Sequence, residues 1–218
     1  MNDSDNALKK SPSLLSPVVR AYERRLRQFG PEARGVFWKD ENFQHQRYDI
    51  LYQVFDEIDQ AGGITVHDFG CGYGALFSYL KDRPVMRDSR YIGTDMSAEM
   101  ISTARRLVVD PRASFVRHLK ATGPVDITFA SGTYNMHVGQ DETRWETYVK
   151  ASLKQIWGKT RKALAFNMLR EDADERFDGL YYINGRDLFD FCIRELSPDV
   201  TIQNDSPLPD WTFIVRRG

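Results

Sequence analysis

One segment constrains the fold of this chain more than any other. It is a strand-like run that passes through three alternating glycines into a helix-like run, and it reads VHDFGCGYGA over residues 66–75. Glycine adopts backbone angles that other residues avoid, and it lets a ligand approach main-chain atoms closely. Open α/β sheets bind ligands at the carboxyl ends of their strands. The segment therefore predicts a ligand site at the end of the first strand of an α/β domain.

The rest of the chain alternates between strand-like and helix-like runs. Strands are expected at residues 64–69, 91–94, 113–117, 125–130, 162–169, 200–203 and 211–215. Helices are expected at residues 75–81, 98–107 with Ser97 as N-cap, 141–157 and 186–195. This alternation predicts a doubly wound α/β fold with a mostly parallel sheet. Only a loop separates the last two strands, so we expect them to pair antiparallel at the sheet edge.

A different pattern precedes the first strand. Residues 1–14 are polar, and we expect them to form a mobile tail. Apolar residues three or four apart then predict helices over residues 17–30 and 41–59. The sequence thus divides into a tail with a helical lid over residues 1–62 and a ligand-binding domain over residues 63–218.

Composition narrows the classes of partner. Lys and Arg total 30 and Asp and Glu total 31, so the formal net charge is −1, which gives no basic surface for nucleic acid or for an acidic membrane. No window approaches the ~20 apolar residues of a membrane-spanning helix. Two cysteines and four histidines do not cluster, so we expect no disulfide framework and no metal. With no secretory pattern at residues 1–17, a cytoplasmic location is expected.

Two acids distinguish between ligands for the glycine loop. Asp95 ends the second strand, where a carboxylate can accept hydrogen bonds from ribose hydroxyls. Asp68 ends the first strand, where its charge would repel a pyrophosphate and attract a cation. S-adenosylmethionine (SAM) carries such a cation, the ammonium of its methionine part. Gly70, Gly72 and Ala75 also fit a dinucleotide fingerprint, so a nicotinamide or flavin enzyme is the alternative. The two acids favour SAM.

Residues 64–218 resemble a class I SAM-dependent methyltransferase. Three segments carry the resemblance: VHDFGCGYG, YIGTDMS and VDITFASGTYN. The resemblance implies a seven-stranded Rossmann-like sheet with Asp95 on the ribose and Met96 packed on the adenine. After the third strand the family often has an acid near the adenine amino group. This chain has residues 117–120 (RHLK) there, which implies recognition of adenine by backbone groups.

A wider pattern is similar to a little-characterised bacterial subgroup that acts on small molecules. Its features here are Trp38, Gln44, Arg47-Tyr48, the SGTYN and FNML segments at residues 131–135 and 166–169, and Tyr181-Tyr182. The subgroup has a late His-Asp-Tyr pattern, and this chain departs from it with residues 204–206 (NDS), so the resemblance does not assign the acceptor.

Methyl transfer requires mainly that donor and acceptor be held in line about 3–3.5 Å apart, so a strong catalytic signature is not needed. The end of the fourth strand is where the acceptor should lie. There we expect Ser131 to contact the methionine part of SAM, Tyr134 and Asn135 to orient the acceptor, and His137 to act as general base. The alternative for His137 is an ordinary histidine in a surface loop.

The segment before the first strand adds two cofactor contacts. Trp38 or Phe37 can face the sulfonium, and Arg47 can pair with the SAM carboxylate. The alternative is a helical hairpin that only covers the sheet. The expected cofactor-binding residues are therefore Trp38, Arg47, Asp68, Gly70, Cys71, Gly72, Gly74, Asp95, Met96 and Ser131.

The sequence therefore predicts a SAM-dependent methyltransferase with a small-molecule acceptor. Two alternatives stay open: intramolecular cyclisation of SAM with release of methylthioadenosine, and a SAM-binding protein without catalysis. We expect neither nucleic acid nor membrane as partner, and a homodimer is left open.

Overall fold

The computed structural model of this chain describes residues 3–56, 61–204 and 207–218. Its strands are β1 Thr65–Phe69, β2 Arg90–Asp95, β3 Ala113–Arg117, β4 Val125–Ala130, β5 Thr160–Arg170, β6 Tyr182–Ile183, β7 Val200–Gln203 and β8 Asp210–Arg216. Its α-helices are α1 Asp3–Phe29, α2 Glu41–Tyr52, α3 Ala75–Leu80, α4 Ala98–Leu107, α5 Glu142–Trp157 and α6 Gly185–Glu195. Short 3₁₀ turns cover Ala33–Val36, Gln53–Phe55 and Pro84–Met86.

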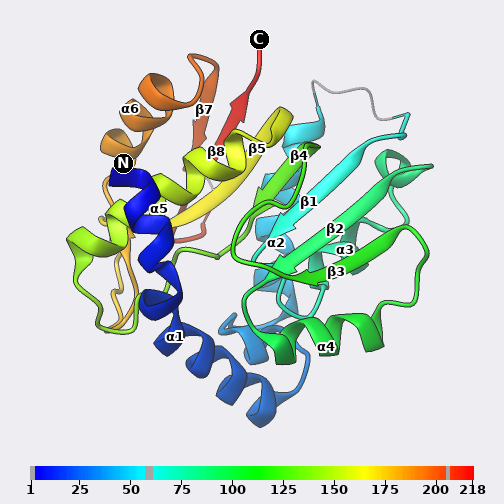
Figure 1. Cartoon of the computed structure of the whole chain (residues 1–218), viewed down its shortest axis with the longest axis horizontal. Coiled ribbons are helices and arrows are strands. Elements are labelled where there is room, and N and C mark those ends of the chain that lie inside the picture. The colour runs from blue at the N-terminus through cyan, green and yellow to red at the C-terminus, as the bar shows by residue number, and fades with distance from the viewer. Residues whose placement is uncertain (1–2, 57–60, 205–206) are drawn as a thin grey trace.

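The strands form one twisted sheet in the order β3-β2-β1-β4-β5-β8-β7, with the short β6 paired to β5 beside this path (Figure 1). All neighbouring strands are parallel except β8, which runs antiparallel to both β5 and β7. This confirms the mostly parallel α/β fold and the antiparallel pairing of the last two strands. The two-residue strand β6 has no recognisable period and is the one element of the sheet that the sequence does not predict.

Helices cover both faces of the sheet. On one face α1 and α5 lie side by side, with α6 next to them (Figure 1). On the other face α2, α3 and α4 pack over β1, β2 and β4. Four helices begin at side chains that accept a hydrogen bond from the first turn, namely Asp40, Ser97, Asp141 and Asn184. These caps satisfy N–H groups that a helix start leaves unpaired, and they fix where the helices point.

The N-terminal helix begins earlier than the sequence pattern indicates. In place of the mobile tail expected over residues 1–14, α1 already begins at Asp3 and includes Pro12 and Pro17. Leu8 and Leu14 are buried in the same core cluster as Val18, on the face of the sheet that carries α5. Burial of this apolar stripe offsets the cost of proline inside a helix. The second predicted helix ends at Tyr52, and residues 57–60 lie outside the described residues.

Truncation of a side chain in the early part of α1 tests this packing. Because Leu14 is buried, Leu14→Ala should lower the free energy of unfolding by about 2–4 kcal/mol, measured by urea denaturation. The control is Arg24→Ala, an exposed change on the same helix. A Leu14→Ala protein within about 0.5 kcal/mol of the parent would mean that this part of α1 is not packed.

Candidate functional site

The glycine loop turns the chain from β1 into α3 at the carboxyl edge of the sheet. Gly70, Gly72 and Gly74 all have positive φ angles, at 81°, 53° and 88°. The N–H groups of Gly70 and Cys71 both donate to the Thr94 carbonyl at the end of β2, at 2.8 and 3.0 Å. The loop is therefore anchored to the neighbouring strand in a conformation that residues with a side chain rarely adopt.

A cavity opens above this loop. It encloses about 940 Å³ of empty space, open solvent at its mouth included. Its walls come from α1, the segment before α2, the glycine loop, and the residues that follow β2, β3 and β4. We call it the first cavity. Seven residues expected to bind a cofactor line it: Trp38, Gly70, Cys71, Gly72, Asp95, Met96 and Ser131. Gly74, at the start of α3, and Asp68 and Arg47 do not line it.

Asp95 is held firmly at the floor of the first cavity. Its two carboxylate oxygens accept hydrogen bonds from the backbone N–H groups of Gly72 (3.0 Å) and Ser97 (2.8 Å). Burial raises the pKa of Asp95, and the backbone donors oppose that shift. A carboxylate has about four lone-pair positions, so both oxygens can still accept hydroxyl groups of a ligand.

Two further features suit a nucleoside ligand with a charged tail. The hydroxyl oxygen of Ser131 is buried at the cavity wall without a hydrogen-bond partner among the described residues. A Cβ atom at Gly70 would lie 2.7 Å from the Thr133 side chain. Only glycine therefore fits between the loop and Thr133 in this wall of the first cavity. The donor set and the space both fit S-adenosylmethionine.

Comparison with known proteins decides the family. A methyltransferase domain family matches residues 66–156. The Mycobacterium tuberculosis (strain H37Rv) protein Rv1506c, whose name assigns it provisionally to the methyltransferases, is 33% identical over 164 residues. That match covers 74% of this chain and 98% of the relative. The chain belongs to the SAM-dependent methyltransferases.

Solved structures agree on the fold. Magnesium protoporphyrin IX methyltransferase (ChlM) from Synechocystis PCC 6803 with bound SAM superimposes with a TM-score of 0.62 at 12% identity, covering 100% of this chain and 98% of that one. A SAM-dependent methyltransferase from Aquifex aeolicus gives a TM-score of 0.51 at 16% identity, covering 76% of this chain and 88% of that one. These structures show that the fold is the Rossmann-like one, and SAM is the cofactor of the family to which the chain belongs.

The methyltransferase motif acid Asp68 lies behind the glycine loop. Its carboxylate accepts a hydrogen bond from the Tyr91 hydroxyl at 2.5 Å, and the residue is almost fully buried. Burial raises the pKa of Asp68 to about 7, against the lowering effect of the Tyr91 hydrogen bond. Contact with the SAM ammonium stays a prediction. The sequence analysis does not identify Tyr91. Its partner Asp68 lies 23 residues earlier, on the neighbouring strand β1, and no local pattern indicates that contact.

Of the three residues expected to be catalytic, only Asn135 faces a cavity. Tyr134 is fully buried, and its hydroxyl pairs with Ser152 of α5 at 2.9 Å. The two ring nitrogens of His137 face the carbonyl oxygens of Gln140 (3.0 Å) and Leu180 (3.1 Å). Neither Tyr134 nor His137 lines a cavity of this site. Gly132 has a positive φ of 66° just after β4, and Tyr134 and His137 are both buried in the segment that follows it.

A second cavity adjoins the first. It encloses about 2080 Å³ of empty space, open solvent included, and Asn135 is part of its wall. Four residues line both cavities: Tyr22, Val36, Trp38 and Gly132. We call Trp38 and Gly132 the shared wall, because the Trp38 ring lies directly against Gly132, where a Cβ atom would be 2.5 Å from the ring.

Arg47 has a partner other than the SAM carboxylate. It is buried and forms an ion pair with Asp210 of β8, which is buried as well. Its guanidinium lies 4.3 Å from the Trp38 ring centroid and 4.1 Å from that of Phe43. Burial lowers the pKa of Arg47 and raises that of Asp210, and each partner opposes the shift of the other. Arg47 thus has a carboxylate partner within the protein and lines the second cavity, so its contact with the SAM carboxylate stays a prediction.

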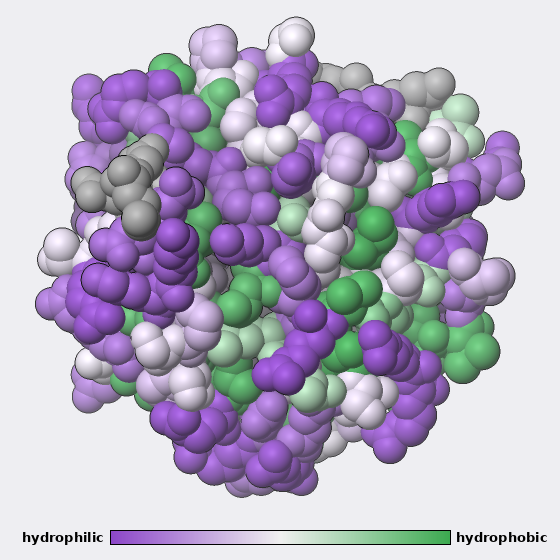
Figure 2. Space-filling view, in the orientation of Figure 1, coloured by the Kyte–Doolittle hydropathy of each residue, from purple (hydrophilic) through white to green (hydrophobic). Residues whose placement is uncertain are grey.

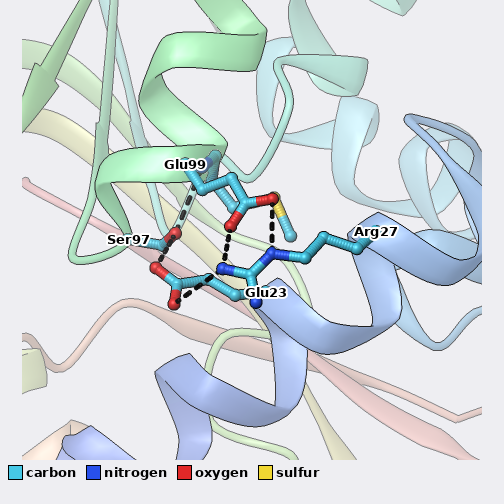
Figure 3. A network of polar contacts seen from close by, with 5 residues as sticks. Glu23, Arg27, Ser97 and Glu99 are labelled. Atoms are coloured by element: carbon cyan, nitrogen blue, oxygen red, sulfur yellow. Dashed lines mark hydrogen bonds and ion pairs between the residues drawn. The ribbon is translucent and has the colours of Figure 1, made fainter.

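Helix α1 closes the first cavity from the side of α4. Glu23 accepts a hydrogen bond from the Ser97 hydroxyl at 2.8 Å, and Arg27 forms a bidentate ion pair with Glu99 at 2.6 and 3.1 Å (Figure 3). Leu15, Val18 and Tyr22 of α1 line the cavity. In the space-filling view, hydrophobic residues come to the surface in the middle of this face, and polar residues surround them (Figure 2).

Two features are absent from the described residues. No helix there has the length and apolar character to cross a membrane. In the same part of the chain, no three His, Cys, Asp or Glu side chains are grouped to hold a metal ion.

Replacement of Asp95 tests the floor of the first cavity. Asp95→Asn keeps only one oxygen acceptor for the Gly72 and Ser97 N–H groups and for the ligand. We expect at least tenfold weaker binding of SAM, measured by titration calorimetry, because hydrogen bonds to a charged group contribute about 1.5–3 kcal/mol each. The matched control is Asp126→Asn, whose carboxylate caps the Thr65 N–H at the other end of the sheet. Equal affinity in Asp95→Asn and the control would contradict this role.

The buried carboxyl of Asp68 predicts a pH dependence of stability. Because its pKa is raised, its contribution to folding is fully present below about pH 4 and is lost as the pH rises through about 7. Asp68→Asn stays neutral, so its free energy of unfolding relative to the parent should rise from pH 5 to pH 8. Urea denaturation at both pH values measures this, with the exposed Asp82→Asn as control. A difference that does not change with pH would show that Asp68 is ionised in the folded protein.

Proposed function

We propose that this protein transfers the methyl group of SAM to a small-molecule acceptor held in the second cavity. The observation that carries the proposal is the shared wall: Trp38 and Gly132 line both cavities. The two cavities therefore adjoin at these residues, so SAM in the first cavity and an acceptor in the second would lie next to each other. In-line displacement needs two adjacent, aligned ligands.

The chain supplies binding and alignment. SAM, when bound, supplies an electrophilic methyl carbon on a sulfonium. Asp95 would hold the ribose, Met96 the adenine, and the glycine loop with Ser131 the methionine part. Trp38, at the wall, would face the sulfonium, since aromatic rings attract cations. We further propose that residues 1–62 form the lid of this site and residues 63–218 the SAM-binding domain.

The second cavity favours a compact acceptor with aromatic and charged parts. Its aromatic lining consists of Tyr22, Phe37, Trp38, Phe43, Phe177 and Tyr182. Arg25 and Lys39 bring positive charge from the N-terminal segment, and Asp174 and Glu175 bring negative charge from the loop after β5. The net charge of −1 disfavours nucleic acid as acceptor. One structural relative, ChlM, is named for a small-molecule acceptor, magnesium protoporphyrin IX.

Both cysteines, Cys71 and Cys192, are buried and unpaired, which supports a reducing compartment such as the cytoplasm. This location is part of the proposal.

The test begins with purified protein and SAM without an acceptor. SAM, S-adenosylhomocysteine (SAH) and methylthioadenosine are quantified over time by mass spectrometry, and the incubation is repeated with pools of aromatic acids, aromatic amines and heterocyclic compounds. The proposal predicts SAH, together with a product 14 Da heavier than its acceptor, only when a pool is present.

Three results would overturn the proposal. Methylthioadenosine formed without an acceptor would mean that SAM itself is the substrate and is cyclised. SAM that binds but gives no SAH with any pool would indicate a binding protein. Methylation of added RNA in place of the pools would move the acceptor to the macromolecules. Asp95→Asn serves as the matched inactive control.

A further inference from the structure

A buried polar network adjoins the shared wall, and its residue Arg47 also lines the second cavity. At its centre Arg47 of α2 and Asp210 of β8 form an ion pair in which each side chain is 2% exposed. Asn167 of β5 donates from its side-chain amide to Asp210 at 3.0 Å. The carbonyl oxygen of the same Asn167 side chain accepts the backbone N–H of Gly132 at 2.9 Å. The network thus connects the ion pair to one of the two residues of the wall.

The other residue of the wall is held by the same ion pair. The Arg47 guanidinium carbon lies over the Trp38 ring, 4.3 Å from its centroid, and over the Phe43 ring, 4.1 Å from its centroid. Arg47 also donates to the Phe43 carbonyl oxygen at 2.9 Å, which keeps the guanidinium in this stack. Trp38 and Gly132, which touch each other, are therefore each fixed by a different end of one network.

Stability alone does not account for this arrangement. Taking two charges out of water costs several kcal/mol for each ion, and a hydrophobic pair of similar volume is often equally stable or more stable. Arg47, Asp210 and Asn167 come from three elements that are far apart in the chain, and their contacts converge on Trp38 and Gly132. What a network with fixed donor and acceptor geometry adds is a single position for the groups that it holds.

We infer that Arg47, Asp210 and Asn167 are positioning residues that hold Trp38 and Gly132 at the boundary between the cofactor and the acceptor. Trp38 is the residue that contacts the SAM sulfonium, and the network acts through it. The inference rests on the proposed function, because it takes the shared wall as the place of methyl transfer. It also gives a role to three segments that resemble the bacterial subgroup. These are the segments that contain Arg47, Gly132 and Asn167.

The test compares the affinities of SAM and SAH, measured by titration calorimetry, and needs no acceptor. SAM is cationic at sulfur and SAH is neutral there, so their affinity ratio reports the contact of the ring with the sulfonium. Trp38→Leu should lower the ratio of SAM to SAH affinity about fivefold, within the range of cation–π contacts. Asp210→Asn should lower the ratio by a similar factor because the ring is no longer held in place.

Asp210→Asn alone leaves the Arg47 charge buried without a counter-ion and is at risk of failing to fold. The double variant Arg47→Met with Asp210→Asn removes both charges, so it should fold and still lose the SAM preference. Added to Trp38→Leu, these two changes should not lower the ratio further, since both act through the same ring. The matched control is Thr160→Val, which removes a buried hydrogen bond to Thr128 at the other end of β5 and should leave the ratio unchanged.

A double variant that keeps the parental ratio, while Trp38→Leu loses it, would overturn the positioning role. A Trp38→Leu protein with the parental ratio would overturn the contact between the ring and the sulfonium, and with it the inference. Either result is independent of the acceptor screen, so a failure of the inference can be told apart from a failure of the proposed function.

Discussion

The left-handed backbone of Gly70, Gly72 and Gly74 is the constraint on which the rest of the site depends. Each glycine faces a different part of the fold. A Cβ atom would meet Thr133 after β4 at Gly70, Val36 of the N-terminal segment at Gly72, and Phe115 of β3 at Gly74. Space is tight at Gly70 and Gly74, and contact is ordinary at Gly72; Thr133 and Val36 also line the first cavity. The loop thus belongs both to the packing between these segments and to the wall of the SAM site.

Buried charge at this site is concentrated where it can orient other groups. Asp95 uses both oxygens to hold the backbone at Gly72 and Ser97, and Asp68 is bound to Tyr91 behind the loop. The Arg47–Asp210 pair adjoins the shared wall. A buried charge without partners would cost far more than any of these contacts contributes, so each one fixes the position of its neighbours. The cofactor cavity is thus bordered by hydrogen-bonded polar groups, whereas several aromatic side chains line the second cavity.

Local patterns in the sequence predict most of the fold but not the partners of its polar side chains. Strand periodicity and the glycine loop predict the parallel sheet, and the position of Asp95 at the end of β2 predicts its place in the cavity. The sequence does not predict the early part of α1, because it contains Pro12 and Pro17, and proline usually marks a helix boundary. The buried contacts of Tyr134 with Ser152 and of His137 with Leu180 are not predicted either, because these partners lie on other segments of the chain. Asp210 lies 163 residues after Arg47, and no local spacing indicates such a pair.

A crystal structure of the protein with bound SAH tests the account most directly. We expect the ribose hydroxyls on Asp95 and the SAH sulfur beside Trp38 and Gly132. The face of the sulfur that carries the methyl group in SAM should point toward the second cavity. The Arg47–Asp210 pair should be unchanged in that complex. A sulfur that faces α1, or one separated from the second cavity by protein atoms, would contradict the account, because a methyl group on that sulfur could not reach an acceptor across the shared wall.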